Sequence, residues 1–271
     1  MSYVRAIVIA LILPVMLAAC ADKPSSSAKP GPEAARRELI LRDIDFDEQS
    51  FLANAAAGDA RAVNAFLLAG MNPNVKNERG ETALIAASVK GDVAIIKALL
   101  GGGADINARD KDNWTALMRA IRNEKDEVTQ VLLDHNPDVN AQGKSGESAL
   151  MLALWKGSPE LVQNLLARNA DVNAKDMDDA TPLIWAAMTG ETNGAHELLQ
   201  KGANPNSRTK TGGTALIYAA ANNHQQLARD LLDHGADPTA KDNKGQNAEA
   251  WANKSNLTEV VNLLREAKKK K

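Results

Sequence analysis

The sequence predicts an all-α solenoid of about seven helix–turn–helix units, connected by short β-turn or hairpin loops. The leading observation is a motif that recurs every 33 residues. Its clear copies begin at Thr82, Thr115, Ser148, Thr181 and Thr214. A fixed period in this range is typical of stacked repeats, in which each unit packs on its neighbours. An aromatic content of 3% also suits a fold packed from alanine and leucine.

The unit that begins at Thr82 shows how each part of the motif is expected to fold. Thr82 supplies a hydroxyl cap for a short first helix, and Gly91 suits the left-handed backbone that ends it. The second helix, over 93–100, runs antiparallel to the first and has one apolar face. That face consists of Ile95, Ile96, Leu99 and Leu100. Gly103 breaks this helix, and 104–108 leads to the turn of the next unit.

The segment after each second helix resembles the ankyrin repeat. The matching segments are Gly103-Ala104-Asp105-Ile106-Asn107, Ala170-Asp171-Val172-Asn173, Gly202-Ala203-Asn204-Pro205-Asn206 and Gly235-Ala236-Asp237-Pro238. The resemblance covers about residues 46–267, with five strong copies in register. It implies a solenoid of helix pairs that binds other proteins and rarely carries out chemistry.

The departures from the ankyrin pattern are local. Asn136-Pro137 replaces the usual Gly-Ala, and Asn113 and Asp179 replace the turn glycine. Asparagine and aspartate tolerate the same left-handed backbone, so we expect these turns to form. The family's helix histidine is replaced by an apolar residue in every copy, and apolar packing is expected in its place. The replacing residues are Ile85, Met118, Met151, Ile184 and Ile217.

We expect the repeat domain to span residues 38–267. Its first unit, over 49–77, lacks the Thr-x-Leu opening, and the preceding Leu39-Ile40-Leu41 is expected to add part of a cap. Terminal units need a polar outer face for solubility. Residues 268–271 form a basic tail, interpreted as a solvated helix end that complements the helix dipole. Contact of this tail with an acidic surface is the alternative.

The N-terminus predicts export. Residues 1–19 combine Arg5 with a short apolar run and are expected to be a lipoprotein signal peptide, because the run is too short to span a bilayer comfortably. The sequence Leu17-Ala18-Ala19-Cys20 resembles the lipobox of bacterial lipoproteins, whose cysteine thiol accepts a diacylglyceryl group. Cys20 is therefore the predicted lipidation site. Ordinary signal-peptidase cleavage after Ala21 is the alternative.

The same resemblance implies a location. Ala21, and not aspartate, follows Cys20, which in Gram-negative lipoproteins favours transfer to the outer membrane. Residues 20–37 carry three prolines and a serine run and cannot bury apolar area, so a flexible linker is expected after the lipidated cysteine. The expected product is lipid-anchored in a bacterial envelope and faces the periplasm.

Ankyrin stacks bind partners on their concave side, and the resemblance implies the same here. The variable position four residues after each Thr or Ser lies on that side. Along the chain it is occupied by Ala86, Arg119, Leu152, Trp185, Tyr218 and Trp251. Trp155, seven residues after Ser148, lies one turn further along the same face, and Trp114 lies at a turn. All four tryptophans are thus expected on the binding side.

Tryptophan and tyrosine are enriched at interface hot spots, so the concave face is predicted to bind a partner protein. Arg119, Arg122 and Lys156 are expected to frame the site with charge. The predicted partner-binding residues are Trp114, Arg119, Arg122, Trp155, Lys156, Trp185, Tyr218 and Trp251. In the alternative interpretation, the rings pack on one another between the first helices and the long cationic side chains are merely solvated.

Several classes of function are excluded at this point. A net charge of −2 gives no case for nucleic-acid binding, and a single cysteine excludes an intrachain disulfide or a cysteine-based metal site. His135 and His234 share one register three repeats apart, which repetition explains better than a metal site. Since no nucleophile–base pair, carboxylate pair or phosphate loop is apparent, we predict no enzyme activity, cofactor, metal or small-molecule substrate.

Two functional hypotheses follow, both for an unidentified periplasmic or envelope partner protein. The first is an envelope-anchored scaffold or adaptor, since some periplasmic ankyrin proteins resemble this chain and are associated with catalase and peroxide defence. The second is an immunity or self-protection protein that inhibits a periplasmic toxin or cell-wall hydrolase. A purely structural role would follow if the tryptophans were buried.

Overall fold

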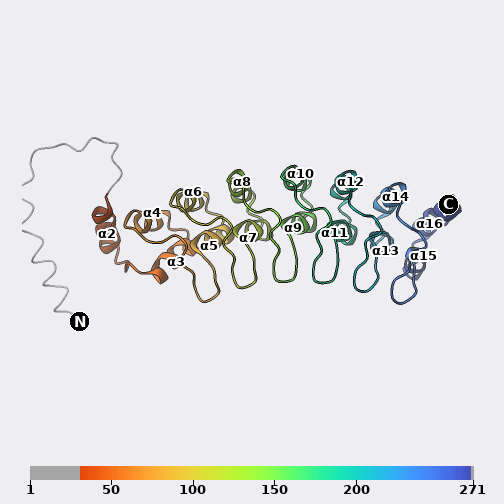
Figure 1. Cartoon of the computed structure of the whole chain (residues 1–271), viewed down its shortest axis with the longest axis horizontal. Helices are drawn as coiled ribbons and strands as arrows, with labels where there is room; N and C mark the ends of the chain where they lie inside the picture. Colours follow the sequence, from red (N-terminus) through yellow and green to blue (C-terminus); the bar gives the residue numbers. More distant parts are fainter. Residues whose placement is uncertain (1–30, 270–271) are drawn as a thin grey trace, which may run out of the picture.

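The computed structural model is a single curved row of helix pairs (Figure 1). It describes residues 31–269. Signal peptide 1–19, Cys20, Ala21 and the start of the predicted linker lie outside the described residues, as do the last two lysines. In the described range seven helix pairs follow one N-terminal helix, which confirms the all-α solenoid of about seven units.

The first helices of the seven units, called inner helices below, lie next to the loops. They are α3 (Glu48–Ala57), α5 (Ala83–Lys90), α7 (Ala116–Arg122), α9 (Ala149–Lys156), α11 (Pro182–Thr189), α13 (Ala215–Ala221) and α15 (Ala248–Lys254). The second helices, called outer helices, form the convex edge of the row in Figure 1. They are α4 (Ala60–Leu68), α6 (Val93–Gly101), α8 (Asp126–Asp134), α10 (Pro159–Ala167), α12 (Thr192–Gln200), α14 (Gln225–Asp233) and α16 (Thr258–Lys269).

The helix ends follow the predicted caps. The Thr82 hydroxyl accepts a hydrogen bond from the backbone N–H of Ile85 at 3.3 Å, and Gly91 has a φ of 94°. Thr115, Ser148 and Thr214 cap their helices in the same way. Thr181 differs, since its buried hydroxyl makes no hydrogen bond among the described residues. The repeated hydroxyl residue is therefore the local reason that the four helices α5, α7, α9 and α13 begin where they do.

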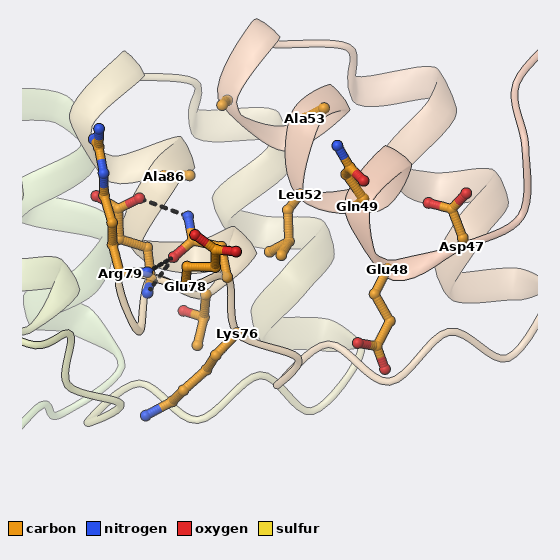
Figure 2. Close-up of a pocket in the computed structure, with 13 residues that line it drawn as sticks. Asp47, Glu48, Gln49, Leu52, Ala53, Lys76, Glu78, Arg79 and Ala86 are labelled. Atoms are coloured by element: carbon orange, nitrogen blue, oxygen red, sulfur yellow. Dashed lines mark hydrogen bonds between the residues drawn. The ribbon is translucent and has the colours of Figure 1, made fainter.

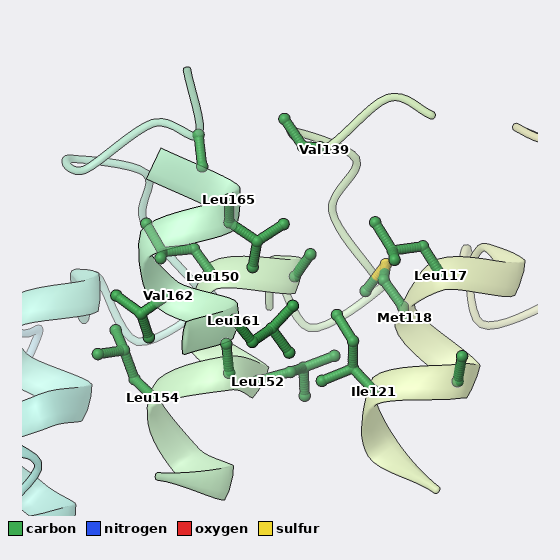
Figure 3. Close-up of a cluster of buried hydrophobic side chains, with 14 of the residues drawn as sticks. Leu117, Met118, Ile121, Val139, Leu150, Leu152, Leu154, Leu161, Val162 and Leu165 are labelled. Carbon is green, nitrogen blue, oxygen red and sulfur yellow. The ribbon is translucent and has the colours of Figure 1, made fainter. Parts of the chain in front are cut away.

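The core is a continuous band of apolar side chains between inner and outer helices. Figure 3 shows its centre, where Leu117 and Ile121 of α7 face α9 and α10. The predicted apolar replacement of the family's histidine is confirmed, since all five replacing residues are buried. Leu165 is fully buried, and burial of such a side chain contributes roughly 2 kcal/mol. Stability thus comes from contacts between neighbouring units, as the period predicts.

The loop that leads from each outer helix to the next inner helix is called a hairpin loop, and these loops stack on one another. Backbone hydrogen bonds join their tips, for example from Met177 N to Ser145 O at 2.8 Å. Each tip has one left-handed residue, including Asn113 with a φ of 60° and Asp179 with a φ of 58°. Both predicted substitutions of the turn glycine are therefore confirmed.

An asparagine side chain joins each hairpin loop to the next. Asn107 Oδ1 accepts the backbone N–H of Asp138 at 2.8 Å, and Asn140 Oδ1 accepts that of Asp171 at 2.8 Å. The same bond occurs at Asn74, Asn173 and Asn206. This bond explains why asparagine recurs at the end of the repeated Ala-Asp-x-Asn segment.

The N-terminal end of the stack differs from the prediction. Helix α2 (Pro32–Leu41) begins inside the predicted linker of 20–37, so the described helical domain begins at Pro32 and not at residue 38. Ala35 and Leu39 are buried against α4, because they lie four positions apart on one face of α2. Of the predicted cap Leu39-Ile40-Leu41, only Leu39 is buried.

The C-terminal end is closed by an ion-paired helix. Helix α16 continues to Lys269, beyond the predicted boundary at residue 267. Glu249 of α15 accepts a hydrogen bond from Arg265 Nε at 2.8 Å and pairs with Lys268 Nζ. Lys268 is therefore held against α15 and is not merely solvated. Among residues 31–269 no helix has both the length and the apolar character needed to cross a membrane.

Glu249→Gln is expected to lower the free energy of unfolding by about 1 kcal/mol or less at neutral pH. The hydrogen bonds from Lys268 and Arg265 lower the pKa of Glu249 below its ordinary value of 4.5. A lowered folded-state pKa stabilises the fold above the unfolded pKa, and this contribution is lost as the pH falls through the folded value. Urea unfolding of both proteins at several pH values should show their difference shrinking in acid. A difference that stayed constant down to about pH 2 would contradict this role for the pair.

Candidate protein-binding groove

The inner helices and the hairpin loops together form one face of the stack, called the groove face below. Two columns of side chains run along it. The first column, at the residue before each N-terminal Thr, Ser or Asn of an inner helix, consists of Glu81, Trp114, Glu147, Ala180, Gly213 and Gln246. The second column, four residues after the cap, is the predicted one from Ala86 to Trp251. In one unit the two columns are complementary in size, since the Tyr218 ring lies 2.7 Å from where a Cβ on Gly213 would be.

Two tryptophans of the second column are fixed by aspartates of their own hairpin loops. Trp185 Nε1 donates to Asp176 Oδ2 at 2.8 Å, and Trp251 Nε1 donates to Asp242 Oδ2 at 2.8 Å. Arg119 Nε makes the equivalent bond to Asp110 Oδ2 at 2.8 Å. In each case the acceptor lies nine residues before the donor. This recurring spacing is visible in the sequence, but the pairing was not predicted from it.

These bonds have electrostatic consequences. Burial raises the pKa of Asp242, but hydrogen bonds from the backbone of Gln246 and Lys244 and from the Trp251 indole outweigh it, so the pKa is lowered. Burial lowers the pKa of Arg119, but the hydrogen bonds and charges of Asp110 and Asp112 outweigh it, so the pKa is raised. Both groups are therefore charged at neutral pH and hold their loops.

The three predicted cationic residues all have intramolecular partners. Arg119 also bonds to Asp112 at 3.1 Å and lies 4.8 Å from the Trp114 ring. Lys156 pairs with Asp126 of α8. The Arg122 guanidinium lies 4.1 Å from the centre of the Trp155 ring.

Three of the four tryptophans meet in one cavity of about 320 Å³, called the tryptophan pocket below. Its lining residues are Trp114, Arg122, Ser145, Glu147, Leu152, Trp155, Asp176, Met177, Asp178 and Trp185. Trp114 Nε1 donates to Glu147 Oε1 at 2.9 Å, so the indole and the carboxylate are held in place across two units. Four of the eight predicted binding residues thus lie together.

The other predicted residues lie beside or beyond this pocket. Arg119 and Lys156 lie beside it, whereas Tyr218 and Trp251 are half-buried further along the row. Within the described range no aromatic ring stacks on any of the four tryptophans or on Tyr218. The ring-on-ring packing considered as an alternative is therefore not how these side chains are held.

A larger cavity of about 890 Å³ lies at the N-terminal end of the groove face and was not predicted. It exists because the second-column position is alanine in the first two units, at Ala53 and Ala86. Figure 2 shows Leu52 pointing into this space, opposite the loop that carries Lys76 and Arg79. The acidic residues that line it are Asp47, Glu48, Glu78 and Glu81. A search for aromatic residues could not find it, because small side chains create it.

The exposed large apolar side chains of the repeats also lie on this face. Val89, Trp155 and Met188 occupy the same position in three units, seven residues after the cap, and are 39%, 46% and 48% exposed. Met177 of the tryptophan pocket is 59% exposed. Among residues 31–269 no group of three or more histidine, aspartate or glutamate side chains has an arrangement that would hold a metal ion.

Comparisons with known proteins agree with this geometry. A family model described as ankyrin repeats (3 copies) matches residues 51–143, 86–176, 127–209, 150–242 and 183–271. A solved structure, the ankyrin repeat domain of Bcl-3, a unique member of the IkappaB protein family, is 27% identical with a TM-score of 0.67. The alignment covers 79% of this chain and 97% of the Bcl-3 chain. No curated protein matches the sequence. The family match, which spans most of the sequence, shows that the chain belongs to the ankyrin-repeat proteins, a family of protein–protein interaction modules.

Proposed function

We propose that this protein is an envelope-anchored adaptor that binds a partner protein in the tryptophan pocket. The observation that carries the proposal is the gathering of three indoles and exposed Met177 around one cavity of the groove face. Exposed apolar surface that is rimmed by polar residues is typical of interaction sites, and tryptophan is the residue most enriched at hot spots. The lipid anchor at Cys20 and the placement at the outer membrane are part of the proposal and rest on the lipobox-like sequence.

The experiment is affinity capture from envelope extract with the full-length chain as bait. The matched baits are Trp155→Ala and Lys97→Ala, which changes an exposed residue of the outer helix α6. We expect the unchanged chain and Lys97→Ala to retain one envelope protein equally well. The amount of that protein captured by Trp155→Ala should be lower by about tenfold or more. Equal capture by all three baits would place the interface elsewhere.

The identity of the captured protein separates the two hypotheses. A stress-defence enzyme such as catalase, still active in the complex, supports the adaptor. A toxin or cell-wall hydrolase that loses its activity on binding supports the immunity role instead. Mass spectrometry of the N-terminal peptide tests the anchor, since a lipidated Cys20 should be the first residue.

Trp155→Ala is expected to change the free energy of unfolding by about 1 kcal/mol or less. The Trp155 side chain is 46% exposed and its indole N–H makes no hydrogen bond among the described residues, so only its packing and the contact with Arg122 are lost. Thermal unfolding followed by circular dichroism measures this change. A loss of several kcal/mol would mean that the ring is mainly structural and would remove Trp155 from the binding proposal.

A further inference from the structure

The tryptophan pocket has more unpaired negative than positive charge. Glu147 Oε1 accepts the Trp114 indole N–H, but Glu147 Oε2 is buried and has no hydrogen-bond partner among residues 31–269. Asp178 is exposed, and in the same range no hydrogen bond or ion pair involves its carboxylate. A buried carboxylate oxygen without a donor is costly, so turning the Glu147 carboxylate toward a donor that a ligand brings into the cavity would be favourable.

The cations nearby do not satisfy these carboxylates. Arg119 is held by Asp110 and Asp112, and Lys156 by Asp126. Arg122, the one cation that lines the pocket within the described residues, lies on the Trp155 ring. Arg119 and Lys156 are thus already paired within the chain, whereas Arg122 has no carboxylate partner among the described residues. The lining still carries one cation against the three carboxylates of Glu147, Asp176 and Asp178, so the charge that faces a partner here is net negative.

Two indoles of this face already make cation–π contacts with arginines of the chain itself. Arg122 lies 4.1 Å from the ring of Trp155 and Arg119 lies 4.8 Å from that of Trp114, both within the range of cation–π attraction. Trp185 has its N–H bound to Asp176, which fixes the ring as a wall of the cavity. Aromatic walls with a buried carboxylate form a site suited to a long cationic side chain.

We infer that the tryptophan pocket binds an arginine or lysine side chain from a basic segment of the partner protein. The inference rests on the proposed function and adds the chemistry of the partner. The side chain would enter the cavity that the indoles of Trp114, Trp155 and Trp185 line, with its charged end at the carboxylates of Glu147 and Asp178. The larger N-terminal cavity is lined by four acidic residues and by Lys76 and Arg79, so its lining is also net negative and suits the continuation of a basic segment along the groove.

The test uses the full-length chain and two small probes, N-acetyl-arginine methylamide and its uncharged isostere N-acetyl-citrulline methylamide. Binding is followed by the NMR shifts of the four indole N–H groups. We expect the arginine probe to bind with a Kd of about 1–10 mM and to shift Trp114, Trp155 and Trp185 but not Trp251. The citrulline probe should bind about fivefold more weakly or worse. Added salt should raise the Kd of the arginine probe, because it screens the attraction between charges.

Two variants test the carboxylates separately. Glu147→Gln keeps an acceptor for Trp114, and Asp178→Asn changes an exposed residue without hydrogen-bonded side-chain partners, so both should fold. Each variant is expected to raise the Kd of the arginine probe by about fivefold. Equal binding of arginine and citrulline, unchanged binding in both variants, or tighter binding of N-acetyl-glutamate methylamide would overturn the inference.

Failure of the inference can be separated from failure of the proposed function. If capture of an envelope protein requires Trp155 but not Glu147 or Asp178, the proposed adaptor function holds and the inference that the partner offers a basic segment is wrong. If the arginine probe binds as expected but no envelope protein depends on Trp155, the pocket chemistry stands and the adaptor function is wrong.

Discussion

Replacing Gly146 with alanine is expected to destabilise the stack by about 3 kcal/mol or more. Gly146 has a φ of 80°, which costs a residue with a side chain roughly 1–2 kcal/mol. A Cβ at this position would also lie only 2.7 Å from the Cα of Asp176 in the next hairpin loop. Backbone atoms cannot move aside as a flexible side chain can, so the two loops would have to separate.

The matched control is Gly245→Ala in the last hairpin loop. Gly245 has a similar φ of 75°, but among the described residues no atom lies within 4 Å of its would-be Cβ, since no other hairpin loop stacks on this side of it there. This variant should therefore lose only about 1–2 kcal/mol, the backbone contribution. Urea unfolding of both variants measures the difference, which isolates the contact between loops from the conformational cost.

The position of Gly146 also predicts how the protein unfolds. The contact of Ser145 with Met177 joins the fourth and fifth units, in the middle of the row. In a solenoid, stability is a sum over units and their interfaces, so a weakened central interface can uncouple the two halves. We expect Gly146→Ala to broaden or split the unfolding transition, whereas Gly245→Ala should leave it single. Equal losses and identical curves for the two variants would contradict the importance of loop stacking.

Much of the fold was predictable because the same pattern of capping and apolar residues recurs in several units. Thr82 and Gly91 delimit an inner helix, and the same pattern gives the period and the number of units. The left-handed turns at Asn113 and Asp179 were predictable because few residue types tolerate that backbone. Helix α2 was not predicted, since its start at Pro32 lies in a proline-rich stretch and its burial depends on the distant α4.

The site was predictable only in part. The repeat register placed Trp114, Trp155 and Trp185 on one face, and the structure brings them into one pocket. Register alone does not show which charges are already paired, so Arg119 and Lys156 were expected to face a partner although each bonds to an aspartate. These pairings can be seen only in the structure, because the partner of Arg119 lies in a hairpin loop and the partner of Lys156 lies in the outer helix of another unit.

Asp176→Ala is expected to lower the free energy of unfolding by about 3 kcal/mol. Asp176 Oδ1 accepts the backbone N–H groups of Asp178 at 2.9 Å and Ala180 at 2.8 Å, which shapes the tip of the hairpin loop. Its Oδ2 accepts the indole N–H of Trp185 at 2.8 Å. Three bonds to one charged acceptor are lost together, at about 1 kcal/mol each.

Two further variants divide this effect. Trp185→Phe removes the indole donor together with part of the ring area, and the lost hydrogen bond should cost about 1 kcal/mol in addition to the lost area, while the two backbone bonds to Asp176 remain. Asp178→Ala is the neighbouring control, since its carboxylate is exposed and has no hydrogen-bond partner among the described residues; it should cost no more than about 0.5 kcal/mol. Chemical unfolding gives all three values.

The same variants connect stability to binding. Without Asp176 the Trp185 ring is no longer fixed as a wall of the tryptophan pocket, so its indole N–H signal should broaden and the arginine probe should bind several-fold more weakly. Asp176→Ala is therefore expected to reduce both folding stability and binding, whereas Asp178→Asn reduces binding alone. If Asp176→Ala unfolded no more easily than Asp178→Ala, the aspartate nine residues before each anchored side chain would not be what holds the groove in shape.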